Sequence, residues 1–204
     1  MQQMPARERM INMKKLMILG AGVYQVPLIK RAKEKGLYTI VVSIPGDYPG
    51  FKLADKIYYE NTTDCEKILE IAQKENIDGI VTAGTDVAVV TVGRVCDAMK
   101  LCGISYEAAQ ISGDKLLMKD QYEKYGVRTA KYRKIFFAYK DIEEKISELT
   151  QPLIFKAVDS SGSRGIIRID DLSKCRETIE EVKKYTKKDY FIAEEFLEGE
   201  EFGA

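Results

Sequence analysis

In the first hundred residues, short apolar runs of strand length alternate with segments whose apolar residues recur at helical spacing. The expected strands are Lys14–Leu19, Tyr38–Ile44, Lys56–Glu60 and Gly79–Thr82. The expected helices are Val23–Lys35, Asp64–Asn76 and Val87–Lys100. Because strands and helices alternate, the pattern predicts a parallel sheet covered by helices, which is a Rossmann-like α/β domain.

Beyond Gly103 this alternation gives way to a different order of elements. The expected helices are Ser105–Ile111, Gly113–Tyr125, Ile142–Leu149 and Leu172–Tyr185, and the expected strands are Lys131–Phe136, Leu153–Phe155, Ile166–Ile169 and Tyr190–Glu195. From Lys131 onward the order is βαββαβ, which is typical of a compact α+β domain. We therefore expect a disordered leader at 1–12, a Rossmann-like domain at 13–111 and a second domain at 112–204.

The composition excludes several classes of protein. The 204 residues include 32 Lys and Arg and 32 Asp and Glu, so the balance of charge favours neither a nucleic acid nor a membrane surface as a partner. The sequence contains no apolar run that could cross a bilayer, and its polar start does not resemble a signal peptide, so a cytoplasmic location is expected. Four unpaired cysteines are expected to be reduced thiols. Because histidine is absent, His-dependent hydrolases and His-ligated zinc sites are excluded.

A glycine turn, Gly20-Ala21-Gly22, follows the first strand and is a candidate phosphate cradle. The third glycine of the dinucleotide fingerprint is replaced by Gln25, and the second strand does not end in an acidic residue. A tight strand-to-helix turn is therefore favoured over a nicotinamide site. Since ligands gather at the carboxyl ends of parallel strands, Gly20 and Gly22 should share one rim with Thr85 and Asp86, although Asp86 is also read as the N-cap of its helix.

The second domain carries the most informative stretch, QPLIFKAVDSSGSRG at 151–165. The strand ends at Lys156, whose ammonium group can reach a phosphate, and Arg164 can bind phosphate oxygens in a fork. Gly162 and Gly165 let the loop backbone turn its N–H groups toward an anion. The competing interpretation of the stretch alone is a hairpin loop with solvated charges.

Three motifs in order extend this interpretation: Asp114-Lys115 before a helix, PLIFKAVDSSGSRGI, and AEEFLEGEEF at 193–202. From Met13 onward the chain resembles the ATP-grasp superfamily, with its Rossmann-like N-terminal domain followed by the α+β lid part of the ATP-grasp domain. It is most similar in character to biotin carboxylase, the carbamoyl-phosphate synthase large subunit and D-alanine–D-alanine ligase. One departure is that serines replace several glycines of the phosphate loop.

The resemblance implies a set of ATP-binding residues. Lys115 and Lys156 match the two nucleotide-phosphate lysines, and the mobile loop over the β- and γ-phosphates corresponds to Ser160, Ser161, Gly162, Ser163, Arg164 and Gly165. Glu194 and Glu195 match positions beside the adenine amino group, Phe196 and Leu197 the adenine hinge, and Glu201 the ribose carboxylate. A backbone C=O and N–H two residues apart can read the adenine edge, and one carboxylate can accept both ribose hydroxyls. Without the lysines, AEEFLEGEEF would be read as a solvated acidic turn.

The resemblance also implies a reaction. The family transfers the γ-phosphoryl group of ATP to a carboxylate, and an amine or a thiol attacks the acyl phosphate, so small-molecule carboxylate and amine substrates are expected. Positioning and charge neutralisation suit lysines and loop N–H groups. Magnesium is expected, with ligands beyond residue 204, and the chain is expected to be the N-terminal portion of a ligase, inactive by itself. Gly20, Gly22, Thr85 and Asp86 are candidates for substrate binding.

Two other functions stay open at this point. One is a nucleotide-binding regulatory protein that keeps the fold without ligase chemistry, and the other is an NAD-linked oxidoreductase built on the Gly20 turn. A homodimer is also left open. Loss of the acidic residues and the asparagine expected downstream of Ala204 would favour the first alternative, and the second predicts that the chain binds NADH rather than ATP.

Overall fold

A computed structural model of the chain describes residues 13–200 and 202. The chain divides into two compact units, Met1–Gly113 and Asp114–Ala204. The expected leader at 1–12 and the expected ribose ligand Glu201 lie outside the described residues. No helix among the described residues is both long and apolar enough to cross a membrane.

Unit 1 is built on a four-stranded parallel sheet with the order β3-β2-β1-β4. The strands are β1 (Lys15–Leu19), β2 (Tyr38–Ser43), β3 (Lys56–Tyr59) and β4 (Gly79–Thr82). Met17, Ile18 and Leu19 are completely buried because both faces of the sheet are covered. Near-continuous apolar runs are typical of parallel strands in that position.

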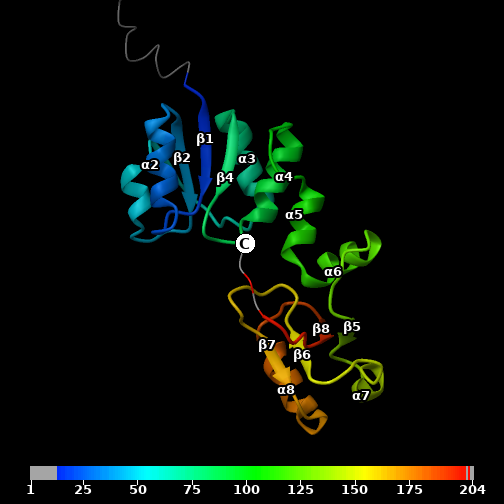
Figure 1. The fold of residues 1–204 in the computed structure, drawn as a ribbon. Helices are drawn as coiled ribbons and strands as arrows, with labels where there is room; N and C mark the ends of the chain where they lie inside the picture. Colours follow the sequence, from blue (N-terminus) through cyan, green and yellow to red (C-terminus); the bar gives the residue numbers. More distant parts are fainter. Residues whose placement is uncertain (1–12, 201, 203–204) are drawn as a thin grey trace, which may run out of the picture. The chain divides into compact units, whose positions relative to one another are not determined.

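Helices pack on both faces of this sheet, as Figure 1 shows. The helical elements of unit 1 are α2 (Val26–Glu34), the 3-10 turn Pro49–Leu53, α3 (Cys65–Glu75), α4 (Val89–Met99) and α5 (Tyr106–Gly113). One apolar cluster joins the sheet to α3 and α4, and the other joins it to α2 and the 3-10 turn. The parallel sheet between two helical layers confirms the α/β class expected for this part of the chain.

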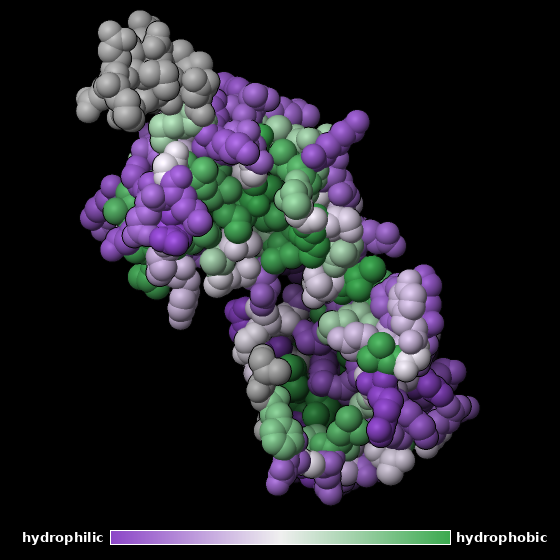
Figure 2. Space-filling model, turned by 45° about the horizontal axis from the view of Figure 1, so that its top comes forward, coloured by the Kyte–Doolittle hydropathy of each residue, from purple (hydrophilic) through white to green (hydrophobic). Residues whose placement is uncertain are grey.

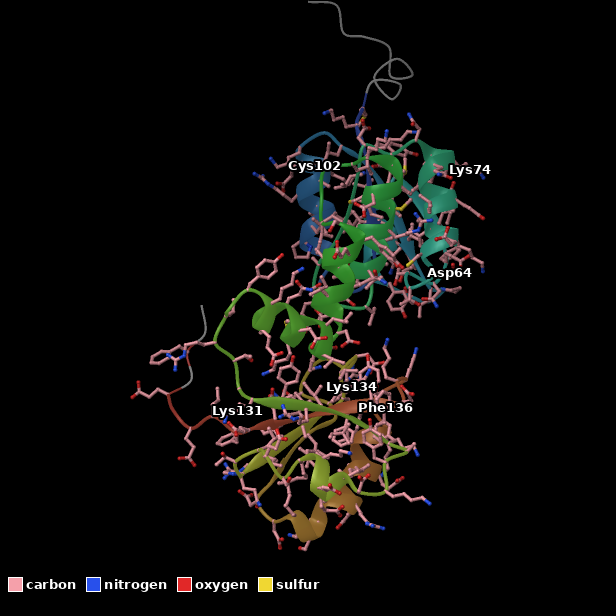
Figure 3. The ribbon with its side chains drawn as sticks, turned by 90° about the vertical axis from the view of Figure 1, so that its right-hand side faces the viewer. Asp64, Lys74, Cys102, Lys131, Lys134 and Phe136 are labelled. Atoms are coloured by element: carbon pink, nitrogen blue, oxygen red, sulfur yellow. The ribbon has the colours of Figure 1, made fainter. Side chains whose placement is uncertain are left out.

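The ends of α3 illustrate how local sequence sets these boundaries. The Asp64 side chain accepts a hydrogen bond from the backbone N–H of Lys67, which satisfies one of the free donors at the helix start. Asn76 ends the helix in the left-handed conformation, with φ 51°. Asp64 and Lys74 lie at opposite ends of α3 in Figure 3, so an acidic and a basic side chain each face the favourable end of the helix dipole.

Unit 2 is built on an antiparallel sheet with the order β5-β8-β6-β7. Its strands are β5 (Tyr132–Phe136), β6 (Leu153–Lys156), β7 (Ile166–Ile169) and β8 (Tyr190–Glu195). Its helices are α6 (Lys115–Lys124), α7 (Ile142–Lys145) and α8 (Cys175–Lys183), the last preceded by the 3-10 turn Leu172–Lys174. From β5 to β8 the order is the expected βαββαβ.

The two faces of this second sheet differ in character. Phe155 and Phe191 belong to the main apolar core, together with residues of α7 and α8. The opposite face carries a smaller cluster in which Leu116 of α6 packs with Tyr132 and Ile192. Charged side chains share that opposite face, because Lys156 pairs in register with Ile192 and Glu194 pairs with Tyr132. The polar face of the sheet is therefore where a ligand site is to be sought.

Three expected helices are shorter or less regular than the sequence suggested. Helix α2 begins at Val26 rather than Val23, because the chain makes a turn first and Pro27 then occupies the first helical turn. Helix α7 ends at Lys145 rather than Leu149, and the residues after it form i to i+3 turns, such as Leu149 N–H to the Ile146 carbonyl at 3.0 Å. The expected helix from Leu172 starts as a 3-10 turn.

The surface in Figure 2 is a mixture of hydrophilic and hydrophobic side chains in both units. Single exposed apolar residues are normal on a protein surface and carry no argument by themselves. The four cysteines, Cys65, Cys96, Cys102 and Cys175, are free thiols, as the sequence predicted.

Candidate nucleotide site

Unit 2 contains a hollow of about 580 Å3 on the polar face of its sheet. It lies between α6, the ends of β6 and β8, and the segment that follows β8. Its lining consists of two lysines, one arginine, four glutamates and several apolar and backbone groups: Lys119, Arg128, Thr129, Ala130, Ile154, Lys156, Glu194, Glu195, Phe196, Leu197, Glu198, Gly199 and Glu200. Five of the residues predicted to bind ATP are therefore brought together around one hollow: Lys156, Glu194, Glu195, Phe196 and Leu197.

Lys156 and Glu194 are direct partners. Lys156 is the last residue of β6, and Glu194 lies on the neighbouring strand β8, where its side chain is only 5% exposed. The Lys156 ammonium forms an ion pair with Glu194 Oε1. The sequence placed both residues at the nucleotide but gave no sign that they contact each other.

Lys119 is a third member of this cluster, and sequence reasoning missed it. Its ammonium lies 2.7 Å from Glu194 Oε2, donates to Thr129 Oγ1 at 2.6 Å, and lies 3.3 Å from the Ala130 carbonyl oxygen. A lysine in the middle of a helix is usually solvated, so the presence of a lysine at position 119 did not by itself indicate a site. Its spacing four residues after Lys115 could have indicated one, because that spacing places both lysines on one side of α6.

The three positive charges affect one another. Burial, followed by the charges of Lys119 and Lys115, lowers the pKa of Lys156 to about 8. Burial also lowers the pKa of Lys119. Within the group formed by Lys115, Lys119, Lys156 and Glu194, the positive charges outnumber the negative one, and a phosphate placed beside Lys156 would relieve the repulsion between the lysines.

Lys115 stands at the start of α6. Asp114 caps this helix, since its Oδ1 accepts from the N–H groups of Leu116 and Leu117 at 2.9 and 3.3 Å. The cap fixes the orientation of the first turn. From there the Lys115 ammonium donates to the Ser160 carbonyl at 2.5 Å. The structure thus brings Lys115 to the loop between β6 and β7.

That loop contains the predicted phosphate-binding residues Ser160 to Gly165. Gly162, Ser163 and Gly165 all have positive φ values of 64°, 59° and 66°. At Gly165 a Cβ atom would come within 2.7 Å of Tyr185 Cβ and 2.8 Å of Ala157 Cβ, so only glycine fits there. The Arg164 Nε donates to the Ser161 carbonyl at 3.1 Å within the loop. The Arg164 side chain is therefore hydrogen-bonded within the loop in this structure.

The segment after β8 has the features expected of an adenine hinge. Phe196 N–H donates to the Pro152 carbonyl at 2.9 Å, which fixes the segment to the strand before it. Glu195 Oε1 accepts from Thr150 N–H at 2.8 Å, so this carboxylate is occupied within the protein. In the described part of the chain, the N–H of Leu197 donates to no protein acceptor. This N–H is therefore left for a ligand.

Unit 1 has a separate hollow of about 360 Å3 at the carboxyl ends of its strands. Gly20, Gly22 and Thr85 line it, as the sequence predicted, but Asp86 does not. The expectation that Asp86 caps its helix was wrong: α4 begins at Val89 with Ala88 in the cap position, and Asp86 contributes its carbonyl oxygen to Val89 N–H at 3.1 Å.

The position of the Gln25 side chain explains why the turn after β1 contains glycine. Its side chain is buried and donates to the Ala83 carbonyl, so it links the turn after β1 to the turn after β4. Gly20 has φ 98°, and a Cβ there would lie 2.9 Å from Gln25 Cδ. The glycine thus makes room for a protein side chain. This arrangement agrees with the prediction of a tight turn and leaves less room for a cofactor pyrophosphate.

Comparison with known proteins shows which proteins this chain resembles. No family model matches the chain. The chain is 29% identical over 199 residues to the phosphoribosylamine–glycine ligase of Clostridium acetobutylicum, a match that covers 92% of this chain and 46% of the relative. It is 34% identical to the crystal structure of phosphoribosylglycinamide synthetase from Anaerococcus prevotii, with a TM-score of 0.69 over 92% of this chain and 47% of that one. The relatives that this chain matches are ATP-grasp ligases.

Further relatives agree with this family. The alanine–anticapsin ligase of Bacillus subtilis is 27% identical over 184 residues, covering 80% of this chain and 39% of the relative. The biotin carboxylase domain of 2-oxoglutarate carboxylase from Hydrogenobacter thermophilus, solved with MgADP, shares the fold with a TM-score of 0.73 at 20% identity, over 91% of this chain and 44% of that one. The chain spans about half the length of the relatives it matches, and its parallel and antiparallel sheets are those of the ATP-grasp fold.

The magnesium ion of that ATP-grasp neighbour has no counterpart site among the residues described here. Residues 13–200 and 202 contain no group of three or more His, Cys, Asp or Glu side chains that could hold a metal ion. Of the four glutamates that line the hollow, Glu194 pairs with two lysines and Glu195 accepts from Thr150 N–H. Glu194 and Glu195 therefore do not fit a magnesium site.

Proposed function

We propose that this chain is the nucleotide-binding portion of an ATP-dependent ligase that joins a carboxylate to an amine through an acyl phosphate. The observation that carries the proposal is the cluster of Lys119, Lys156 and Glu194 beside an unused hinge N–H at Leu197. The hinge suits the adenine edge, and the lysine cluster suits the phosphates. The relatives are ligases that form C–N bonds, which supports the same chemistry.

Within this proposal, Lys156 and Lys115 neutralise nucleotide phosphates, and the β6–β7 loop closes over them. Phosphoryl transfer needs little covalent help from a protein, so positioned positive charges are the main contribution expected of these residues. Magnesium would add charge neutralisation, and its ligands beyond residue 204 stay a prediction. Glu201 as the ribose ligand also stays a prediction, as do a cytoplasmic location and a homodimer.

For the substrate, we propose a small amino acid as the carboxylate. The names of the relatives specify glycine in one ligase and alanine in another. The hollow of unit 1, at Gly20, Gly22 and Thr85, is the proposed place for substrate binding. All the residues that line this hollow are uncharged, so hydroxyl, amide and backbone groups would make the polar contacts there.

Two measurements test the proposal. Isothermal titration calorimetry of the chain with ATP, and with NADH as the control, should show binding of ATP alone; absence of ATP binding at millimolar concentration would reject the nucleotide site. ADP formation by the gene's complete product, assayed with ATP, magnesium and each amino acid in turn, should depend on one or a few amino acids. ATP binding without amino-acid-dependent ADP formation would favour the regulatory alternative.

A further inference from the structure

The Glu194 carboxylate is shared between two lysines on different elements. Its Oε1 pairs with Lys156 at the end of β6, and its Oε2 lies 2.7 Å from Lys119 of α6. The Glu194 side chain is 5% exposed, the Lys119 side chain 11% and the Lys156 side chain 23%. One buried negative charge therefore has two positive partners, of which Lys156 is the more accessible.

A nucleotide phosphate would compete with Glu194 for the ammonium group of Lys156. If Lys156 leaves, Glu194 remains buried, and a buried carboxylate without a partner is costly. Lys119 removes this cost, because it can stay with Glu194 after Lys156 has moved. It is also fixed independently of Lys156, through its hydrogen bonds to Thr129 Oγ1 and the Ala130 carbonyl oxygen.

We propose that Lys119 is a positioning residue that keeps the Glu194 carboxylate paired while Lys156 transfers from Glu194 to a nucleotide phosphate. The proposal rests on the proposed function, since it requires a nucleotide at this site. It assigns Lys119 no contact with the nucleotide. Lys115 cannot take over this role in the observed arrangement, because its ammonium donates to the Ser160 carbonyl in the β6–β7 loop.

The test is a double-mutant cycle on ATP affinity, measured by calorimetry with the whole chain. Lys119→Met should weaken ATP binding by about 30-fold, because Lys156 can then leave only by exposing an unpaired buried charge. In a Glu194→Gln background this charge is gone, so adding Lys119→Met should change ATP affinity by less than about twofold. Lys119→Arg should keep most of the affinity, and Lys124→Met, at an exposed position on the same helix, is the matched control.

A pH series supplies a readout that a purely structural role would not affect. The charge of Lys119 contributes to the lowered pKa of Lys156. In Lys119→Met the pH above which ATP affinity declines should therefore move upward from about 8. An unchanged pH profile would contradict the proposal.

The possible outcomes separate the proposals. If the unmodified chain does not bind ATP, the proposed function fails. If it binds ATP and Lys119→Met binds it equally, the role of Lys119 is rejected. A loss of the same size in the Glu194→Gln background, or a parallel loss of adenosine affinity, would show that Lys119 contacts the nucleotide itself and would also reject it. Should Lys119→Met fail to fold, Lys119→Gln, which also removes the positive charge, replaces it in the same cycle, with a loss of ATP affinity expected beside Glu194 and a change of less than about twofold expected in the Glu194→Gln background.

Discussion

Among the described residues, each unit buries one glutamate against lysines, but the two arrangements differ in how exposed the lysines are. In unit 1, Glu75 at the end of α3 accepts from Lys56 Nζ at 2.6 Å and from Tyr58 OH at 2.5 Å, and Lys15 Nζ is 3.9 Å away. The Lys56 and Lys15 side chains are 42% and 35% exposed. Water can therefore solvate both lysines while they pair with the carboxylate.

The directions in which the pKa values are shifted agree with this difference in exposure. Burial disfavours the charged form of Glu75, but hydrogen bonds from Lys56 and Tyr58 outweigh it and lower its pKa, while the pKa of Lys56 is raised by Glu75. Both charged forms are favoured, which is the signature of a stabilising contact. Around Glu194 the lysine side chains are less exposed, and burial lowers the pKa values of Lys119 and Lys156. Similar residues thus stabilise the fold in one unit and leave positive charge for a ligand in the other.

The largest effect expected from this contrast is on nucleotide binding. Lys156→Met should weaken ATP binding by about 100-fold, because it removes a buried, charge-assisted contact to phosphate. Lys56→Met removes the equivalent lysine from the Glu75 cluster and should leave ATP affinity unchanged. Calorimetric titration of both variants checks the pair. Equal affinities would show that Lys156 does not bind phosphate.

A smaller effect is expected from pH. Because the pKa of Lys156 is about 8, its ammonium loses its proton as the pH rises through that value. Binding of a phosphate favours the protonated form, so ATP affinity should fall by roughly tenfold per pH unit at most above pH 8. The slope should disappear in Lys156→Met. A wild-type affinity that is constant between pH 7 and 9.5 would contradict the assignment.

The sequence predicted the strands of both units but not the contacts that make the two clusters differ. The apolar runs predicted the strands closely, since β4, β7 and β8 have the expected bounds. Lys156 was found because it directly follows an apolar strand and precedes a glycine-containing loop. Signals of this kind come from residues that are adjacent in the chain, so they can be recognised in the sequence alone.

Contacts between residues that are distant in the chain could not be predicted from the sequence. Glu194 and Lys156 are adjacent only because β8 lies next to β6, a sheet order that the strand pattern does not specify. Lys119 and Gln25 both resembled ordinary helix residues, and their roles depend on tertiary contacts with Glu194 and with the Ala83 carbonyl. The error at Asp86 is of the same kind, because the turn after β4 is set by packing rather than by a capping side chain.

The two clusters should also differ in their effect on stability. A lysine whose pKa is lowered by folding is less favourable as a cation in the folded state, so Lys156→Met should raise the free energy of unfolding by about 1 kcal/mol at pH 7. Lys56→Met breaks a partly exposed ion pair and should lower it by up to about 1 kcal/mol. Urea denaturation followed by circular dichroism measures both. Shifts of the same sign would remove the distinction between a structural and a ligand-binding cluster.

The smallest effect concerns acid stability in unit 1. Because the pKa of Glu75 is lowered in the folded state, its contribution is complete above the pKa of the unfolded glutamate, about 4.3, and is lost as the pH falls through the folded value. Glu75→Gln should therefore flatten the decline in stability below about pH 5 by a fraction of a kcal/mol, a change that thermal melts at pH 7 and pH 4 can resolve. Glu66→Gln is the matched control, since that carboxylate pairs with Arg94 on the surface. If the two variants lose the same stability between pH 7 and pH 4, the burial of Glu75 does not increase the contribution of its ion pair to stability.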